Sequence, residues 1–227
     1  PTHLPKPADP QHSEQLVRLV ASAAEQIGGR TLMLTTSLRA LRLIGDSLSA
    51  HFEHSGHIRV LVQGQSPKRR LLEQFRDAGT QGRPGCILVA SMSFWEGVDV
   101  PGDALQMVVI DKLPFPPPND PLVEARSQRV EREGRSAFSA YSMPEAAVAL
   151  KQGAGRLIRS ETDRGVLVIG DTRLTAMGYG KRLLASLPPM RVLKTEAEFG
   201  EMLATLAASS ASTSPLTTSS TMDPTWP

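Results

Sequence analysis

Residues 86–111 read CILVASMSFWEGVDVPGDALQMVVID. Two apolar runs, CILVA at 86–90 and LQMVVID at 105–111, enclose a polar loop that contains two glycines. Runs this short are typical of strands, and strands that are apolar at almost every position are buried on both faces. Helices must then cover both faces of the sheet, so this stretch predicts a parallel α/β fold.

The same pattern extends outward in both directions along the chain. Further strands are predicted at 31–35 (TLMLT), 57–62 (HIRVLV) and 165–169 (GVLVI). Helices are predicted at 11–27, 37–52, 66–79, 122–133, 145–158, 181–187 and 195–206. The first ends at a Gly-Gly pair, the third opens on Ser-Pro as N-cap and N1, and the last opens on a Thr195–Glu198 capping box. The alternation predicts a doubly wound parallel sheet, in which ligands bind at the carboxyl ends of the strands.

The remaining segments suggest the domain organisation. Residues 1–10 are Pro-rich and predict a linker, 11–207 form one domain, and the Ser/Thr-rich residues 208–227 are expected to be disordered. Within the domain, 113–143 is a Pro-rich and charged excursion whose end, 134–143, is expected to be irregular. The arginines of its helix form a solvated, salt-bridged face, or they border the path of a nucleic acid if the domain binds one.

Composition sets limits on function. The net charge is +2 with a pI of 9.0, so a nucleic-acid surface must be a local patch. Cys86 is the only cysteine, which excludes a disulfide or a multi-cysteine metal site within the chain. No stretch approaches the roughly 18 apolar residues that cross a bilayer, and no signal peptide is present. We expect a cytoplasmic protein without membrane contact; the start Pro1-Thr2-His3 indicates a fragment.

The sequence KQGAGRLIR at 151–159 is the first candidate site. On a helix, Gln152, Arg156 and Arg159 would share one face, where two guanidiniums repel each other unless an anion lies between them. A planar, permanently charged fork suits the γ-phosphate during hydrolysis. The alternative is a solvated basic helix whose arginines pair with Glu145 or Glu161.

The loop SFWEGVDVPG directly follows the CILVA strand and is the second candidate. Gly97 permits close approach of a ligand to the backbone. Glu96 and Asp99 offer carboxylates to ribose hydroxyls or to arginines, and Ser93 can donate to a phosphate. The alternative is an ordinary turn around a packed Trp95.

Two more strand ends carry polar groups. Thr35, Thr36 and Ser37 combine hydroxyls with the free N–H groups of a helix N-terminus, which makes an anion site. Gln63 lies at the end of the next strand and at the start of the following helix. The alternative for the hydroxyls is plain N-capping.

These segments together resemble a known family. TLMLTTS, SFWEGVDVPG and QGAGRLIR resemble motifs IV, V and VI of the DinG/XPD group of superfamily 2 DNA helicases, in the right order. IDKLPFPPPNDP and the later YG and LLASLPP are similar to its bacterial DinG-like and YoaA-like members. The resemblance covers about Gly28 to Pro189.

The resemblance implies the second RecA-like motor domain of a 5′-to-3′ ATP-dependent DNA helicase that acts in repair or replication. Arg156 and Arg159 would contact ATP, and Glu96, Gly97, Asp99 and Gln152 would line the nucleotide cleft. Thr35 to Ser37 and Ser93 would face single-stranded DNA, where Gln63 is the further strand-end candidate.

The sequence also lacks parts that this family needs. It contains no GxxxxGK[ST] phosphate loop, no DEAH-type box and no cluster of iron–sulfur cysteines. ATP and Mg²⁺, and an iron–sulfur cluster if there is one, would therefore be held by the first motor domain. We expect no ATPase activity from the isolated chain.

The sequence suggests two other functions. One is a non-catalytic module in which the tail, with Trp226, binds a replication partner; the chi subunit of DNA polymerase III is the candidate that YoaA-like helicases imply. The other is a small nucleotide-binding regulator, against which the missing phosphate loop argues.

Overall fold

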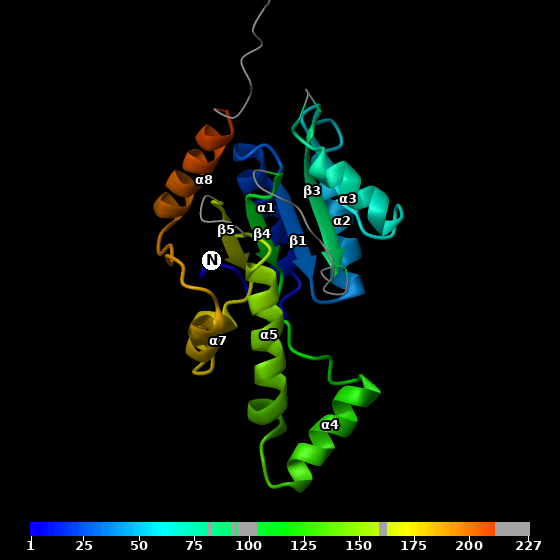
Figure 1. The fold of residues 1–227 in the computed structure, drawn as a ribbon, viewed down its shortest axis with the longest axis vertical. Helices are drawn as coiled ribbons and strands as arrows, with labels where there is room; N and C mark the ends of the chain where they lie inside the picture. The colour runs from blue at the N-terminus through cyan, green and yellow to red at the C-terminus, as the bar shows by residue number, and fades with distance from the viewer. Residues whose placement is uncertain (81–82, 92–93, 95–103, 159–162, 212–227) are drawn as a thin grey trace, which may run out of the picture.

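A five-stranded parallel sheet forms the centre of the molecule (Figure 1). The computed structural model describes residues 1–80, 83–91, 94, 104–158 and 163–211. The strands are β1 (Thr31–Thr35), β2 (Ile58–Val62), β3 (Gly85–Ser91), β4 (Met107–Ile110) and β5 (Val166–Ile169). Their order is β2-β3-β1-β4-β5 and every neighbouring pair is parallel. The predicted parallel α/β sheet is confirmed, and all five predicted strands are present.

Helices cover both faces of this sheet. They are α1 (His12–Gln26), α2 (Leu38–His51), α3 (Lys68–Arg76), α4 (Pro121–Arg132), α5 (Met143–Ala154), α6 (Arg173–Ala176), α7 (Gly180–Ser186) and α8 (Glu196–Ala211), with a π-helix at Phe138–Ser142. Among the described residues, no helix combines the length and the apolar character that crossing a membrane requires.

The core consists of two layers because successive strand residues point to opposite faces. In β1, Met33 packs with α1, α2 and α8, whereas Leu32 and Leu34 pack with α3, α5 and α7. In β3, Ile87 and Leu88 divide in the same way. This division is that of a doubly wound sheet, as the sequence predicts.

Some predicted boundaries differ from the structure. Helix α3 begins at Lys68 and Pro67 is its N-cap, so Ser66 does not cap it, because Pro67 has extended backbone angles (ψ 142°). Helix α5 ends at Ala154 rather than Ile158. The prediction that 134–143 is irregular is wrong from Phe138 onward, where a π-helix forms and continues into α5.

The ends of the domain also extend further than expected. Leu4, in the predicted linker, is 5% exposed and belongs to the core layer that α1 covers. Helix α8 continues to Ala211, four residues into the predicted tail. The four-residue α6 has no predicted counterpart, because so short a helix shows no periodicity.

The predicted excursion forms a protruding hairpin. Helix α4 has no buried side chain, and Asp120 caps it by accepting from the backbone N–H groups of Leu122 and Val123. Figure 1 shows α4 and the lower part of α5 extending beyond the ends of the strands. The hairpin therefore projects from the body of the domain near the carboxyl edge of the sheet.

Candidate functional site

The carboxyl ends of β1 and β4 are joined through one buried carboxylate. The Thr36 backbone N–H donates to Oδ1 of Asp111 at 2.9 Å, and the Thr36 hydroxyl donates to Oδ2 at 3.4 Å. The Lys112 backbone N–H also donates to Oδ1, at 2.7 Å. Burial raises the pKa of Asp111, and the hydrogen bonds from Thr36 and Lys112 oppose that rise. Asp111 therefore holds the loop after β1 in place.

The three predicted hydroxyls after β1 have different environments. Thr35 is fully buried and its hydroxyl donates to the Ala90 carbonyl at 3.3 Å, so it joins two strands. Thr36 is half-buried on Asp111. Ser37 is exposed, and its hydroxyl accepts from the Ala40 N–H at 3.2 Å, which confirms it as the N-cap of α2. Of the three, Thr36 and Ser37 face outward enough to meet a ligand.

Gln63 joins the carboxyl ends of β2 and β3. Its Oε1 accepts from the Ser91 backbone N–H at 2.7 Å and from the Ser91 hydroxyl at 2.9 Å. The side chain is half-buried, and its amide nitrogen has no hydrogen-bond partner in the described part of the chain. The oxygen is therefore committed to the fold, while the nitrogen is free to donate.

Two arginines that sequence reasoning missed lie beside these residues. Arg39 and Arg42, in the first turns of α2, are exposed and have no ion-pair partner among the described residues. Their signal in the sequence is their spacing, two and five residues after the capping Ser37. They add positive charge to an edge that already presents hydroxyl and amide groups.

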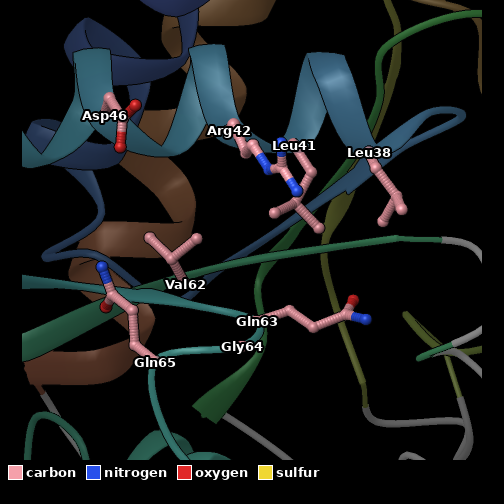
Figure 2. A pocket seen from close by; sticks show the side chains of 8 residues that line it. All are labelled: Leu38, Leu41, Arg42, Asp46, Val62, Gln63, Gly64 and Gln65. Carbon is pink, nitrogen blue, oxygen red and sulfur yellow. The ribbon is translucent and has the colours of Figure 1, made fainter.

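A groove of about 360 Å³ runs between α2 and the end of β2. Its lining residues are Leu38, Leu41, Arg42, Asp46, Val62, Gln63, Gly64 and Gln65. Figure 2 shows Leu41 and Arg42 reaching from α2 toward the end of β2, with the Gln63 side chain extending from the other wall. The groove thus joins one predicted polar strand end, that of β2, to the basic start of α2.

The end of α5 differs from the predicted single helix face. Gln152 is exposed in the last helical turn, but Arg156 lies in the turn that follows the helix. The Arg156 backbone N–H donates to the Gly153 carbonyl at 3.1 Å. Arg156 is half-buried and has no ion-pair partner in the described ranges, so the alternative pairing with Glu145 is not found. Arg159 and Glu161 lie outside the described residues.

Arg156 and the polar strand ends occupy different parts of the domain. Leu157, its neighbour, packs against Gly165, the residue that precedes β5, so Arg156 lies toward the amino end of that strand. Thr36 and Gln63 lie past the carboxyl ends of β1 and β2. The structure therefore divides the predicted residues into two groups.

The predicted motif V segment is described only at Phe94. Ser93, Glu96, Gly97 and Asp99 lie outside the described residues. Phe94 is described: it is buried, and the Lys68 ammonium lies 5.0 Å from its ring centroid.

A second buried carboxylate follows β5 and was not predicted. Oδ2 of Asp171 accepts from the Leu113 backbone N–H at 2.8 Å and from the Arg173 guanidinium at 2.7 Å. Burial alone would raise the pKa of Asp171, but the hydrogen bonds from Arg173 and Leu113 outweigh it and lower the pKa. This contact fixes the start of the Pro-rich segment to the end of β5.

Two of the three arginines of α4, the helix of the protruding hairpin, are paired or stacked. Arg129 pairs with Glu133 at 3.5 Å, and the Arg126 guanidinium lies 5.8 Å from the Tyr141 ring centroid. These contacts fit the predicted solvated, salt-bridged face.

The described residues contain no His, Cys, Asp or Glu group that could hold a metal ion. Burial raises the pKa of the Cys86 thiol to about 11, so it remains protonated at neutral pH. A protonated, buried and single thiol does not fit an iron–sulfur ligand set.

Comparison with known proteins decides the family. Residues 20–190 match the family described as the helicase C-terminal domain, which is more than half of the chain. The chain belongs to the helicase C-terminal domain family. This helicase domain is 45% identical over 187 residues to the ATP-dependent DNA helicase YoaA of Escherichia coli. It is 40% identical over 189 residues to the ATP-dependent helicase DinG of Mycobacterium tuberculosis.

The matched part covers most of this chain but little of each relative. It is 82% of the chain in both cases, and 28% of YoaA and 27% of DinG, so the helicase domain spans less than a third of their length. A solved XPD helicase resembles it with a TM-score of 0.56 at 19% identity, covering 79% of this chain and 32% of that one. The helicase domain is thus of the DinG and YoaA type with an XPD-like, RecA-like fold.

Proposed function

We propose that this helicase domain is the C-terminal motor half of an ATP-dependent 5′-to-3′ DNA helicase that acts in DNA repair or replication. In this role it supplies Arg156 to ATP held by the first motor domain, while its strand ends contact single-stranded DNA. We propose DNA and ATP as its ligands because the relative YoaA is named as an ATP-dependent DNA helicase.

The environment of Arg156 is the observation that carries the proposal. A half-buried guanidinium loses part of its hydration, and no carboxylate among the described residues compensates it. The developing charge on a γ-phosphate would supply that compensation, and a guanidinium fork matches phosphate oxygens geometrically. Arg159 and Gln152, with Glu96, Gly97 and Asp99, complete the proposed nucleotide side.

The proposed DNA surface lies at the carboxyl edge of the sheet. Ser37 and the Gln63 amide nitrogen would donate to phosphates, and Arg39 and Arg42 would neutralise them. Thr36, whose N–H and hydroxyl both donate to Asp111, would position the loop that carries Ser37. Thr35 contributes to this surface only indirectly, because its hydroxyl is bonded inside the sheet. Ser93 remains part of the proposed surface.

Substitution of Arg156 in the full-length helicase tests the nucleotide role. We expect Arg156→Ala to lower DNA-stimulated ATP hydrolysis by about 10³-fold or more, the range for an arginine acting on a transferred phosphoryl group. Affinity for single-stranded DNA should be retained, because Arg156 is separate from the carboxyl edge. Arg18→Ala, which removes an exposed residue paired with Glu14, is the matched control. Wild-type hydrolysis by Arg156→Ala would contradict the proposal.

Several partners belong to the proposal. ATP and Mg²⁺ would be held mainly by the first motor domain, and any iron–sulfur cluster would lie there too, since Cys86 does not fit one. The isolated domain should therefore hydrolyse no ATP. The chi subunit of DNA polymerase III is the proposed replication partner, and Trp226, its proposed contact, lies outside the described residues. A pull-down of chi with and without residues 221–227 tests that contact.

A further inference from the structure

Three aromatic rings gather on the surface beyond the carboxyl ends of β4 and β5. Phe115 follows β4, Phe138 begins the π-helix, and Tyr179 precedes α7, so three distant segments contribute. The ring centroids are 5.5 Å apart for Phe115 and Phe138, 5.8 Å for Phe115 and Tyr179, and 5.3 Å for Phe138 and Tyr179. We refer to these three residues as the aromatic cluster.

The cluster remains open to solvent. Phe138 is 42% exposed, and Phe115 and Tyr179 are half-buried against the core layer beneath them. The chain has ten Phe, Trp and Tyr residues in all, so three of them meet in this one place. An exposed group of aromatic rings on a domain so poor in them indicates a binding surface.

The cluster is held in a fixed arrangement. The Arg173 guanidinium lies 5.7 Å from the Phe115 ring centroid and is bonded to the buried Asp171. The same carboxylate accepts from Leu113, two residues before Phe115. The aromatic cluster is therefore already in place before a ligand binds, which reduces the entropy lost on binding.

The α7 side of the cluster carries positive charge. Between 171 and 190 the only carboxylate is Asp171, which is buried and bonded to Arg173. Lys181 and Arg182, in the first turn of α7, are exposed and have no ion-pair partner in the described part of the chain. Aromatic rings bordered by cations are what single-stranded nucleic acid binds, because bases stack while phosphates are neutralised.

The position also fits the proposed DNA surface. The order β1-β4-β5 places the cluster next to the end of β1, where Thr36 and Ser37 lie, on the same edge of the sheet. We infer that Phe115, Phe138 and Tyr179 form a stacking platform for bases of the single strand that crosses this edge. This inference rests on the proposed function, since it assumes single-stranded DNA as the ligand.

Paired oligonucleotides test the platform. Binding of the 227-residue chain to a labelled oligo-dT and to an abasic oligomer of equal length can be followed by fluorescence anisotropy. We expect Phe138→Ala to weaken oligo-dT binding by about fivefold to 150-fold, the range for loss of one stacked base. Binding of the abasic oligomer should be unchanged, and Phe138→Tyr should bind both as wild type does. Val148→Ala, which shortens another exposed apolar residue (55%), should change neither.

The outcomes separate this inference from the proposed function. If wild type binds both oligomers and Phe138→Ala binds oligo-dT equally tightly, the platform is wrong while the DNA surface stands. The platform is also wrong if Phe138→Ala weakens both oligomers equally, because that indicates a structural effect. If wild type binds neither oligomer, the proposed DNA surface itself fails.

Discussion

The backbone N–H of Thr36 donates to Oδ1 of Asp111 at 2.9 Å, which joins the loop after β1 to the end of β4. This carboxylate is fully buried, and its oxygens accept hydrogen bonds from Thr36 and Lys112. Loss of the carboxylate would leave buried donors unpaired, which costs about 1–3 kcal/mol.

Replacement of Asp111 should therefore destabilise the domain and disturb the loop. We expect Asp111→Leu to lower the free energy of unfolding by about 1–3 kcal/mol and to weaken single-stranded DNA binding. Asp111→Asn keeps the Oδ1 acceptor and should cost less. Urea unfolding measures the first effect and anisotropy the second; equal stability of Asp111→Leu and wild type would show that the contact contributes nothing.

Ser37 allows capping and DNA contact to be separated. Ser37→Ala removes the acceptor of the Ala40 N–H and should lower the free energy of unfolding by about 1 kcal/mol. Ser37→Asp keeps an N-cap and should retain stability, but it adds a negative charge where we propose a phosphate. Its affinity for single-stranded DNA should therefore fall. An unchanged affinity in Ser37→Asp would remove Ser37 from the proposed surface.

Arg42 should contribute to the salt dependence of binding. If it neutralises one phosphate of a single strand, Arg42→Gln lowers the slope of log affinity against log salt by about 0.7. Anisotropy titrations at several salt concentrations give this slope. Arg18→Gln, in an exposed pair with Glu14 on α1, is the control and should leave the slope unchanged. A slope in Arg42→Gln equal to that of wild type would count against a phosphate contact.

Gly165 controls the position of Arg156 through Leu157. A Cβ at Gly165 would lie 2.8 Å from the Gln106 carbonyl oxygen and against the Leu157 side chain. We expect Gly165→Ala to cost about 1–3 kcal/mol of stability and, in the full-length helicase, to lower ATP hydrolysis by displacing Arg156. Gly56→Ala, whose Cβ would meet nothing within 4 Å, should change neither. Normal hydrolysis by a destabilised Gly165→Ala would show that Arg156 does not depend on this packing.

The two buried aspartates should give opposite pH trends. The pKa of Asp171 is lowered from its ordinary 3.8, so its stabilisation is present above pH 3.8 and is lost as the pH falls through the lower folded value. The stability difference between wild type and Asp171→Asn should therefore shrink at acid pH. Burial raises the pKa of Asp111, so wild type should gain on Asp111→Asn as the pH falls through that raised value. Urea unfolding across this pH range measures both differences.

The sequence determined the elements whose signals are local. Continuous apolar runs marked all five strands, and β1 has the predicted bounds 31–35. The capping box was also correct: the Thr195 hydroxyl accepts from the Glu198 N–H at 3.1 Å, and Glu198 accepts from the Thr195 N–H at 3.3 Å. Such signals are readable because they depend on neighbours within a few residues.

Motif resemblance also gave the family, but it did not give the geometry of the site. The prediction that Gln152 and Arg156 share a helix face is wrong, because α5 ends at Ala154. Thr35 carries the expected residue type, yet its hydroxyl is used inside the sheet. Residue type alone does not show whether a polar group is free or already bonded.

The tertiary structure decided which distant residues meet. Thr36 and Asp111 are 75 residues apart, and they meet because β1 and β4 are neighbours in the sheet. Phe115, Phe138 and Tyr179 are separated by an entire helical hairpin and a strand, and only their packing forms one exposed cluster. Strand order and helix ends result from the burial of both faces of the sheet, and the free energy of that burial depends on contacts throughout the chain. Local sequence patterns determine the helices and strands, whereas these long-range contacts determine the surfaces on which function depends.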